Sequence, residues 1–250
     1  MKKLMFALGV ATLCASVQAV ESANVVGYSS ATLEANKFYL IAAQFQDTTG
    51  TSVDLQDFIK SSDMAGSADF DDETAPNLKI WNGVGYDDYF FWAEDYFGEE
   101  NVWCDGGMKV DDVSVDIGNG AFLKVKNACT ITVAGQVAAA ATLKVPLTAG
   151  VFNLIANPYP IAFDINGTAW DCKTALPAGT QQEDETSPNI KIWNGSSYED
   201  YYFWAEDYFG EENVWCDSGM KAENVVIQPL HGFWLKYTNS AEDVDLTFTK

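Results

Sequence analysis

The residues that could perform chemistry are mainly carboxylates. Two carboxyl groups that face one substrate could cleave a glycosidic bond. Histidine offers little, because the single histidine, His231, lies in an expected turn between Pro229 and Gly232. Nothing in the sequence marks one carboxyl as buried with a raised pKa. We therefore predict no catalytic residue and no enzyme. The carboxylates considered are Glu94, Asp95, Glu99 and Glu100, which recur as Glu206, Asp207, Glu211 and Glu212.

Aromatic side chains interleaved with acids are the second chemical feature. Flat rings stack on the C–H faces of sugars, while nearby carboxylates and amides bond to the hydroxyl groups. Strand alternation would place Tyr86, Phe90 and Trp92 on one face and Tyr89 and Phe91 on the other, and one face must be core. Exposure of the other row would create two equivalent binding surfaces; core packing of each ring is the alternative. The candidate ligand-binding residues are Trp81, Tyr86, Tyr89, Trp92, Trp193, Tyr198, Tyr201 and Trp204.

Four cysteines that follow the N-terminal segment could form disulfides: Cys104, Cys129, Cys172 and Cys216. An even number in an exported protein favours disulfides, and no C-x-x-C spacing suggests zinc. The preferred pairs are Cys104–Cys129 and Cys172–Cys216, because each closes a loop within its own half. A Cys104–Cys216 bond between the halves is the alternative.

Acidic loops at residues 69–73 and 183–185 carry the oxygen ligands that Ca²⁺ prefers. Neither loop has the D-x-D-x-D-G spacing of a calcium site, so a solvated loop is the favoured interpretation. We expect no metal site and no cofactor, with calcium as the less favoured alternative.

The chain contains an internal duplication. Residues 75–113 align without a gap with residues 187–225 at an offset of 112, and 29 of the 39 positions are identical. Within this block, residues 91–105 (FWAEDYFGEENVWCD) recur letter for letter as residues 203–217. A repeat of this length is a duplicated domain-sized unit rather than a solenoid repeat. Recent duplication and a constraint on the central block would each explain the identity.

Strands and turns must position these residues. Asn82-Gly83 and Asn194-Gly195 separate aromatic and apolar runs, which is a strong hairpin signal because both residue types tolerate positive φ. One short helix is expected over residues 53–59. The expected strands cover 24–29, 37–45, 78–81, 86–92, 113–117, 121–125, 130–137, 190–193, 198–204, 233–237 and 244–248. The sequence therefore predicts an all-β fold with a minor helix, in which two antiparallel β-sandwich-like repeats, related by duplication, pack together.

The N-terminus predicts export. Residues 1–19 combine Lys2 and Lys3, an apolar stretch and the small-residue end Val17-Gln18-Ala19, as in a secretory signal peptide. No later segment has ~18 uninterrupted apolar residues, so we expect no membrane span in the mature chain. The expected division is a signal peptide at 1–19, β repeat 1 at 20–137 and β repeat 2 at 138–250.

The charge of the chain disfavours one class of partner. The formal net charge is −22, and the sequence contains no arginine. Such a surface repels nucleic acid and lacks the guanidinium group that phosphate recognition prefers. We expect no nucleic-acid partner.

The second half also carries a recognisable motif series. Residues 152–160 (FNLIANPYP) resemble the "NLIGNPYP" segment of β-sandwich units in exported proteins of Bacteroidetes and related bacteria. Residues 190–198 and 232–236 (GFWLK) resemble the hairpin and the glycine-led strand that follow it there. Residues 21–28 (ESANVVGY) are similar to mature N-termini of exported proteins from Verrucomicrobia and Lentisphaerae. The resemblance implies an exported β-rich module and brings no established catalytic residue.

These observations predict a non-enzymatic structural or adhesive protein of the envelope, cell surface or extracellular space, including the periplasm. Its partners would be other surface proteins, a polysaccharide or further copies of itself. A carbohydrate-binding module is the alternative function, and a secreted glycoside hydrolase is the third.

Overall fold

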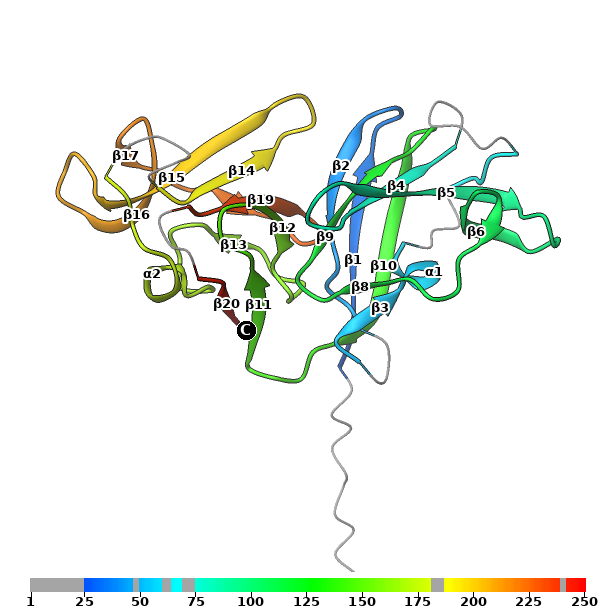
Figure 1. Cartoon of the computed structure of the whole chain (residues 1–250), viewed down its shortest axis with the longest axis horizontal. Helices are drawn as coiled ribbons and strands as arrows, with labels where there is room; N and C mark the ends of the chain where they lie inside the picture. Colours follow the sequence, from blue (N-terminus) through cyan, green and yellow to red (C-terminus); the bar gives the residue numbers. More distant parts are fainter. Residues whose placement is uncertain (1–24, 47–49, 60–63, 69–74, 181–186, 239–241) are drawn as a thin grey trace, which may run out of the picture.

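Two six-stranded antiparallel sheets dominate the fold of the computed structural model (Figure 1). The structure describes residues 25–46, 50–59, 64–68, 75–180, 187–238 and 242–250. The first sheet has the order β2 (Phe38–Ala42), β9 (Gly120–Lys124), β4 (Asn77–Trp81), β5 (Tyr86–Glu94), β6 (Glu100–Asp105) and β7 (Met108–Lys109). The second sheet has the same order with β12 (Phe152–Ala156), β19 (Gly232–Lys236), β14 (Asn189–Trp193), β15 (Tyr198–Glu206), β16 (Glu212–Asp217) and β17 (Met220–Lys221).

Each large sheet is accompanied by two antiparallel two-stranded ribbons. Beside the first sheet, β1 (Val25–Leu33) pairs with β10 (Cys129–Val137), and β3 (Ser52–Asp54) pairs with β8 (Ser114–Asp116). Beside the second, β11 (Thr142–Leu147) pairs with β20 (Val244–Thr249), and β13 (Phe163–Asp164) pairs with β18 (Val226–Ile227). The predicted all-β, duplicated, sandwich-like class is confirmed.

The predicted hairpins form as their turn residues require. In the β4–β5 connection, Gly83 has φ +93°, and the Asn82 side chain accepts hydrogen bonds from the backbone N–H groups of Val84 and Gly85 at 3.1 and 2.8 Å. Gly195 has the corresponding φ of +95° between β14 and β15. The expected helix is also present, in the shorter span α1 (Leu55–Phe58), with Asp54 as its N-cap. A second short helix, α2 (Cys172–Ala175), was not expected.

A large apolar core lies between the inner face of each six-stranded sheet and its ribbons. In the first, Leu78, Phe91 and Trp103 from the sheet pack with Ile131 from β10. The second core draws on the equivalent strands but also includes Phe45, Val133 and Val137 of the first half. The two cores are therefore joined by side chains that cross from one half to the other.

The halves meet through paired backbone hydrogen bonds. The N–H of Ala42 donates to the carbonyl of Leu230 at 2.8 Å, and the N–H of Ala156 donates to the carbonyl of Gly118 at 2.7 Å. These two bonds link equivalent positions in opposite directions, as a pseudo-twofold axis requires. A Cβ placed on Gly232 would lie 3.3 Å from the Ile155 carbonyl oxygen and 3.7 Å from the Cα of Gly120. Glycine at the start of β19 thus permits the close approach of the halves.

One buried side chain completes this junction. The Gln44 amide is 1% exposed. Its Nε2 donates to the carbonyls of Asn157 and Tyr159 at 2.9 and 3.0 Å, and its Oε1 accepts from the N–H of Leu230 at 2.8 Å. Gln44 therefore supplies hydrogen-bond partners to buried backbone groups of the other half.

The structure contains none of the predicted disulfides. Cys104, Cys172 and Cys216 are buried free thiols, so neither of the preferred pairs nor the Cys104–Cys216 alternative is formed in this structure. The reason is the face of the sheet on which each side chain lies: Cys104 and Cys216 point away from the main cores into separate outer clusters. Burial, the largest effect, raises the pKa of each of these two thiols to about 11. Such thiols are poorly nucleophilic.

Candidate functional site

Four of the eight candidate aromatic residues are buried. Tyr89 faces the first core and Tyr201 the second, as alternation along the strand predicted. Trp92 and Trp204 lie on the opposite face, but each is only 6% exposed because it belongs to an outer apolar cluster. Both faces of this part of β5 and β15 are thus covered. These four rings lack the exposed face that stacking on a sugar requires.

The other four candidates, Trp81, Tyr86, Trp193 and Tyr198, lie where the halves meet. Trp81 contacts Trp234 of the other half edge to face, with ring centroids 5.5 Å apart. Trp193 donates from Nε1 to the carbonyl of Phe38 in the first half at 2.6 Å. These contacts of Trp81 and Trp193 connect the two halves. Tyr86 nevertheless remains 42% exposed, and burial, followed by the influence of Tyr198, raises its pKa to about 12.

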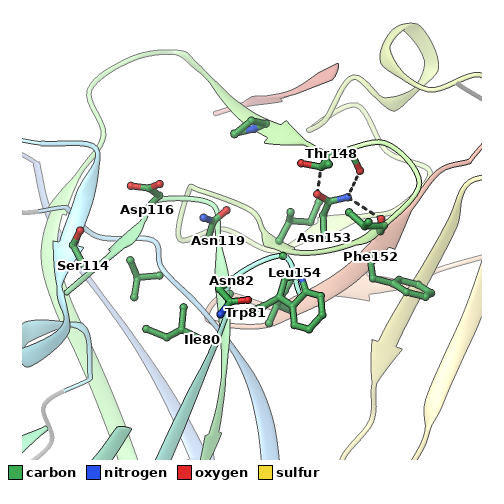
Figure 2. Close-up of a pocket in the computed structure, with 16 residues that line it drawn as sticks. Ile80, Trp81, Asn82, Ser114, Asp116, Asn119, Thr148, Phe152, Asn153 and Leu154 are labelled. Atoms are coloured by element: carbon green, nitrogen blue, oxygen red, sulfur yellow. Dashed lines mark hydrogen bonds between the residues drawn. The ribbon is translucent and has the colours of Figure 1, made fainter. Parts of the chain in front are cut away.

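A cavity of about 480 Å³ opens beside these rings (Figure 2). Its walls come from the β4–β5 turn, β8 and β9 of the first half and from β12 of the second. Ser114, Asp116 and Asn119 lie along one side of it in Figure 2. On another side, the Asn153 amide accepts from the N–H of Thr148 at 2.8 Å and donates to its carbonyl at 3.0 Å, so it is engaged in a turn.

A related cavity of about 260 Å³ lies at the pseudo-twofold position. Trp193, Asn194 and Ile227 occupy the places of Trp81, Asn82 and Val115. The two cavities differ in their polar walls, because His231 replaces Asn119. The duplication has therefore produced two junction cavities with different chemistry.

The most exposed aromatic rings of the duplicated block are at its hairpin ends. We call residues 95–99 the first tip and residues 207–211 the second tip. Tyr96 and Phe97 are 71% and 79% exposed, and their copies Tyr208 and Phe209 are 73% and 79% exposed. Figure 1 places β5 and β6 at one end of the long axis of the molecule and β15 and β16 at the other. Two identical aromatic tips thus lie at opposite ends of one chain.

A buried carboxylate shapes the first tip. Asp95 Oδ1 accepts from the N–H groups of Phe97 and Glu99 at 2.8 and 2.9 Å, and Oδ2 accepts from the N–H of Lys109 at 3.3 Å. Burial alone would raise the pKa of Asp95, but these backbone hydrogen bonds outweigh it and lower the pKa. This is opposite to the raised pKa of a glycosidase acid.

The second tip repeats this arrangement. Asp207 accepts from the N–H groups of Phe209, Glu211 and Lys221 at 2.8, 2.9 and 3.1 Å, and the bond from Glu211 is the main cause of its lowered pKa. An ion pair also closes each tip: Lys109 lies 2.8 Å from Glu99, and Lys221 lies 2.7 Å from Glu211. The backbone of each tip is therefore held in one conformation while its rings face solvent.

The choice of candidates from sequence overlooked Phe97 and Phe209. The candidates were tryptophans and tyrosines, and four of those eight rings are buried. The sequence does contain a signal for Phe97. This large apolar residue stands just before Gly98, between acidic residues, in a segment that is repeated without change. A ring in a turn between acidic residues is not expected to be buried in an apolar core.

The Tyr96 ring packs directly against Gly107. A Cβ at this position would lie 2.5 Å from the ring, and its φ is +86°. We expect Gly107→Ala to strain the backbone by about 1–3 kcal/mol and to move Tyr96 off Trp92, whose ring centroid is 5.5 Å away. Gly83→Ala is the matched control, because Gly83 has a similar φ and no atom within 4 Å of the added Cβ. Ring-current shifts of Tyr96 in NMR spectra should change only in Gly107→Ala; the same change in both variants would contradict this account.

Some predicted features fall outside the described residues, namely the signal peptide and the acidic loops at 69–73 and 183–185. Among the residues that are described, no group of three or more His, Cys, Asp or Glu side chains could hold a metal ion. In the same part of the chain, no helix is long and apolar enough to cross a membrane.

Comparison of the chain with protein-family models, curated proteins and solved structures finds no match.

Proposed function

We propose that the protein is an exported, non-enzymatic structural or adhesive protein that contacts its partner through the two aromatic tips. The observation that carries this proposal is the exposure of the same aromatic pair, Tyr96-Phe97 and Tyr208-Phe209, at both ends of the molecule (Figure 1). Packing accounts for identical core residues such as Trp103 and Trp215. It gives no reason to retain two exposed phenylalanines.

The surroundings of the tips suggest what kind of partner they fit. Glu94, Glu99 and Glu100 are exposed around the first tip, and their copies surround the second. An apolar ring within an acidic border suits a partner that has an apolar hollow bordered by basic or hydrogen-donating groups. The overall charge of −22 opposes contact between tips of two copies.

The placement of the tips suggests how the protein would work. The rings are fixed by Asp95 and Asp207, and the two halves are fixed to one another by the junction hydrogen bonds. A rigid body with equal contacts at both ends can join two partner molecules. This is the behaviour expected of a structural linker rather than of an enzyme.

The proposal is tested by removing both exposed phenylalanines. We expect the double variant Phe97→Ser/Phe209→Ser to fold normally and to be retained far less than the wild type on cell-envelope preparations of the producing organism. Tyr28→Ser and Val84→Ser are matched controls, because they remove exposed apolar groups, 77% and 93% exposed, away from the tips. Fluorescently labelled protein in a sedimentation assay provides the measurement. Equal retention of the double variant and the wild type would rule out the tips as the contact.

A further inference from the structure

A groove floored by aromatic rings extends from the larger junction cavity. It has a volume of about 420 Å³ and shares Trp81, Gly83, Val151 and Phe152 with that cavity. Its floor combines Trp81 and Tyr86 of the first half with Phe152 and Trp234 of the second. Neither half could form this floor alone.

The rings of the groove are inclined to one another. Trp81 and Trp234 meet at 87° with centroids 5.5 Å apart, and Trp81 and Tyr86 meet at 61° and 5.1 Å. Phe152 packs against Trp234 at 74° and 6.1 Å. Edge-to-face packing supports each ring from the side and leaves ring surface directed at the groove. Tyr86 is the most exposed of the floor residues.

The adjoining cavity supplies hydrogen-bonding groups. Ser114 and Asp116 are exposed and Asn119 is half-buried along its wall (Figure 2). The Tyr86 hydroxyl is protonated at neutral pH, as an ordinary tyrosine hydroxyl is, and it can donate. The combined site therefore has apolar ring surface at one end and donors and acceptors at the other.

The charge of the site limits the ligand. Among the described residues, the charged side chains that line the groove and the cavity are Lys236 and Asp116, one of each sign. Lys236 Nζ lies over the Phe152 ring at 5.3 Å from its centroid. The surrounding protein carries a net charge of −22, which repels anions. A neutral ligand with both C–H faces and hydroxyl groups fits these conditions.

The pseudo-twofold cavity has a different lining. It is bordered by Tyr39, Leu40 and His231 beside Trp193. At the position of Trp234, the first half has Phe122. The ring at this position is thus an indole in the groove and a phenyl ring in the first half.

We propose that this groove, between the two halves, binds a neutral polysaccharide chain whose sugar rings stack on Tyr86 and Trp81 and whose hydroxyl groups bond to Asp116 and Asn119. The site is separate from the two tips, so it adds to the proposed function and does not depend on it. A protein with both would hold a glycan at its centre and a partner at each end.

Titration with cellohexaose, xylohexaose and mannohexaose tests this proposal, with tryptophan fluorescence and calorimetry as readouts. We expect at least one of the three to bind saturably and to change the emission of Trp81 or Trp234. Tyr86→Ala should weaken that binding roughly tenfold, equivalent to about 1.4 kcal/mol. Tyr28→Ala, which removes an exposed tyrosine elsewhere, should leave it unchanged.

Two further variants keep the test decisive. Asp116→Ala alters an exposed side chain at the polar end and should weaken binding several-fold even if loss of the Tyr86 ring disturbs the junction. Phe97→Ser should have no effect, which separates this site from the tips. Absence of saturable binding to all three hexaoses would overturn the proposal. Unchanged binding in a folded Tyr86→Ala variant would also overturn it. If Tyr86→Ala does not fold, unchanged binding in Asp116→Ala would overturn it instead.

Discussion

Replacing Gln44 with leucine is expected to lower the free energy of unfolding by about 3 kcal/mol. Leucine matches the size of the buried side chain but removes its three hydrogen bonds to the second half. The N–H of Leu230 and the carbonyl of Asn157 would then be buried without this partner. Each such group costs about 1–3 kcal/mol when it is left unpaired.

Urea denaturation followed by tryptophan fluorescence measures this effect. Gln46→Leu is the matched control, because Gln46 lies two residues further along and its backbone, not its side chain, forms the bond to Gln136. We expect the control to change stability by less than about 0.5 kcal/mol. Equal stability of the two variants would show that the Gln44 amide does not hold the halves together.

Removal of one tip is expected to reduce strongly the linking of two partners while leaving binding to one. The tips lie at opposite ends of the molecule (Figure 1), so loss of either leaves a single contact. Phe97→Ser and Phe209→Ser should each still bind envelope-coated beads, because the other tip is unchanged. Each should clump the beads far less than the wild type does.

Turbidity of the bead suspension reports the clumping, and the bound label reports binding in the same sample. Tyr28→Ser serves as the control that keeps both tips, and it should clump the beads as the wild type does. A single-tip variant that clumps the beads as well as the wild type would contradict the two-ended arrangement. Linking would then have to come from another surface.

Much of the fold could be predicted from local patterns. Asn-Gly turns marked the β4–β5 and β14–β15 hairpins, because their backbone conformation favours those residues. Strand β6 was not expected, because Val102, Trp103 and Cys104 are all buried and so show no alternation between apolar and polar residues. Strand β11 was not expected either, since Pro146 within it discourages a strand assignment.

The site was harder to predict, for a different reason. Periodicity assigned Tyr89 and Trp92 to opposite faces of one strand correctly, but it could not show that both faces are covered. The groove depends on Trp234 meeting Trp81, which lies 153 positions earlier in the chain. No local pattern reports such a contact. The even number of cysteines predicted disulfides, whereas Cys104 and Cys216 lie on the outer faces of different sheets, in separate clusters.

The central claim is that the exposed tips, and not the buried rings, contact the partner. Photo-crosslinking tests it most directly, with benzoylphenylalanine placed in the full chain instead of Phe97, Phe209 or Val84. Val84 is exposed on the β4–β5 turn and provides the control position. We predict that positions 97 and 209 give adducts with the same partner, identified by mass, and that position 84 gives none. Adducts from position 84 alone, or different partners at the two tips, would contradict the account.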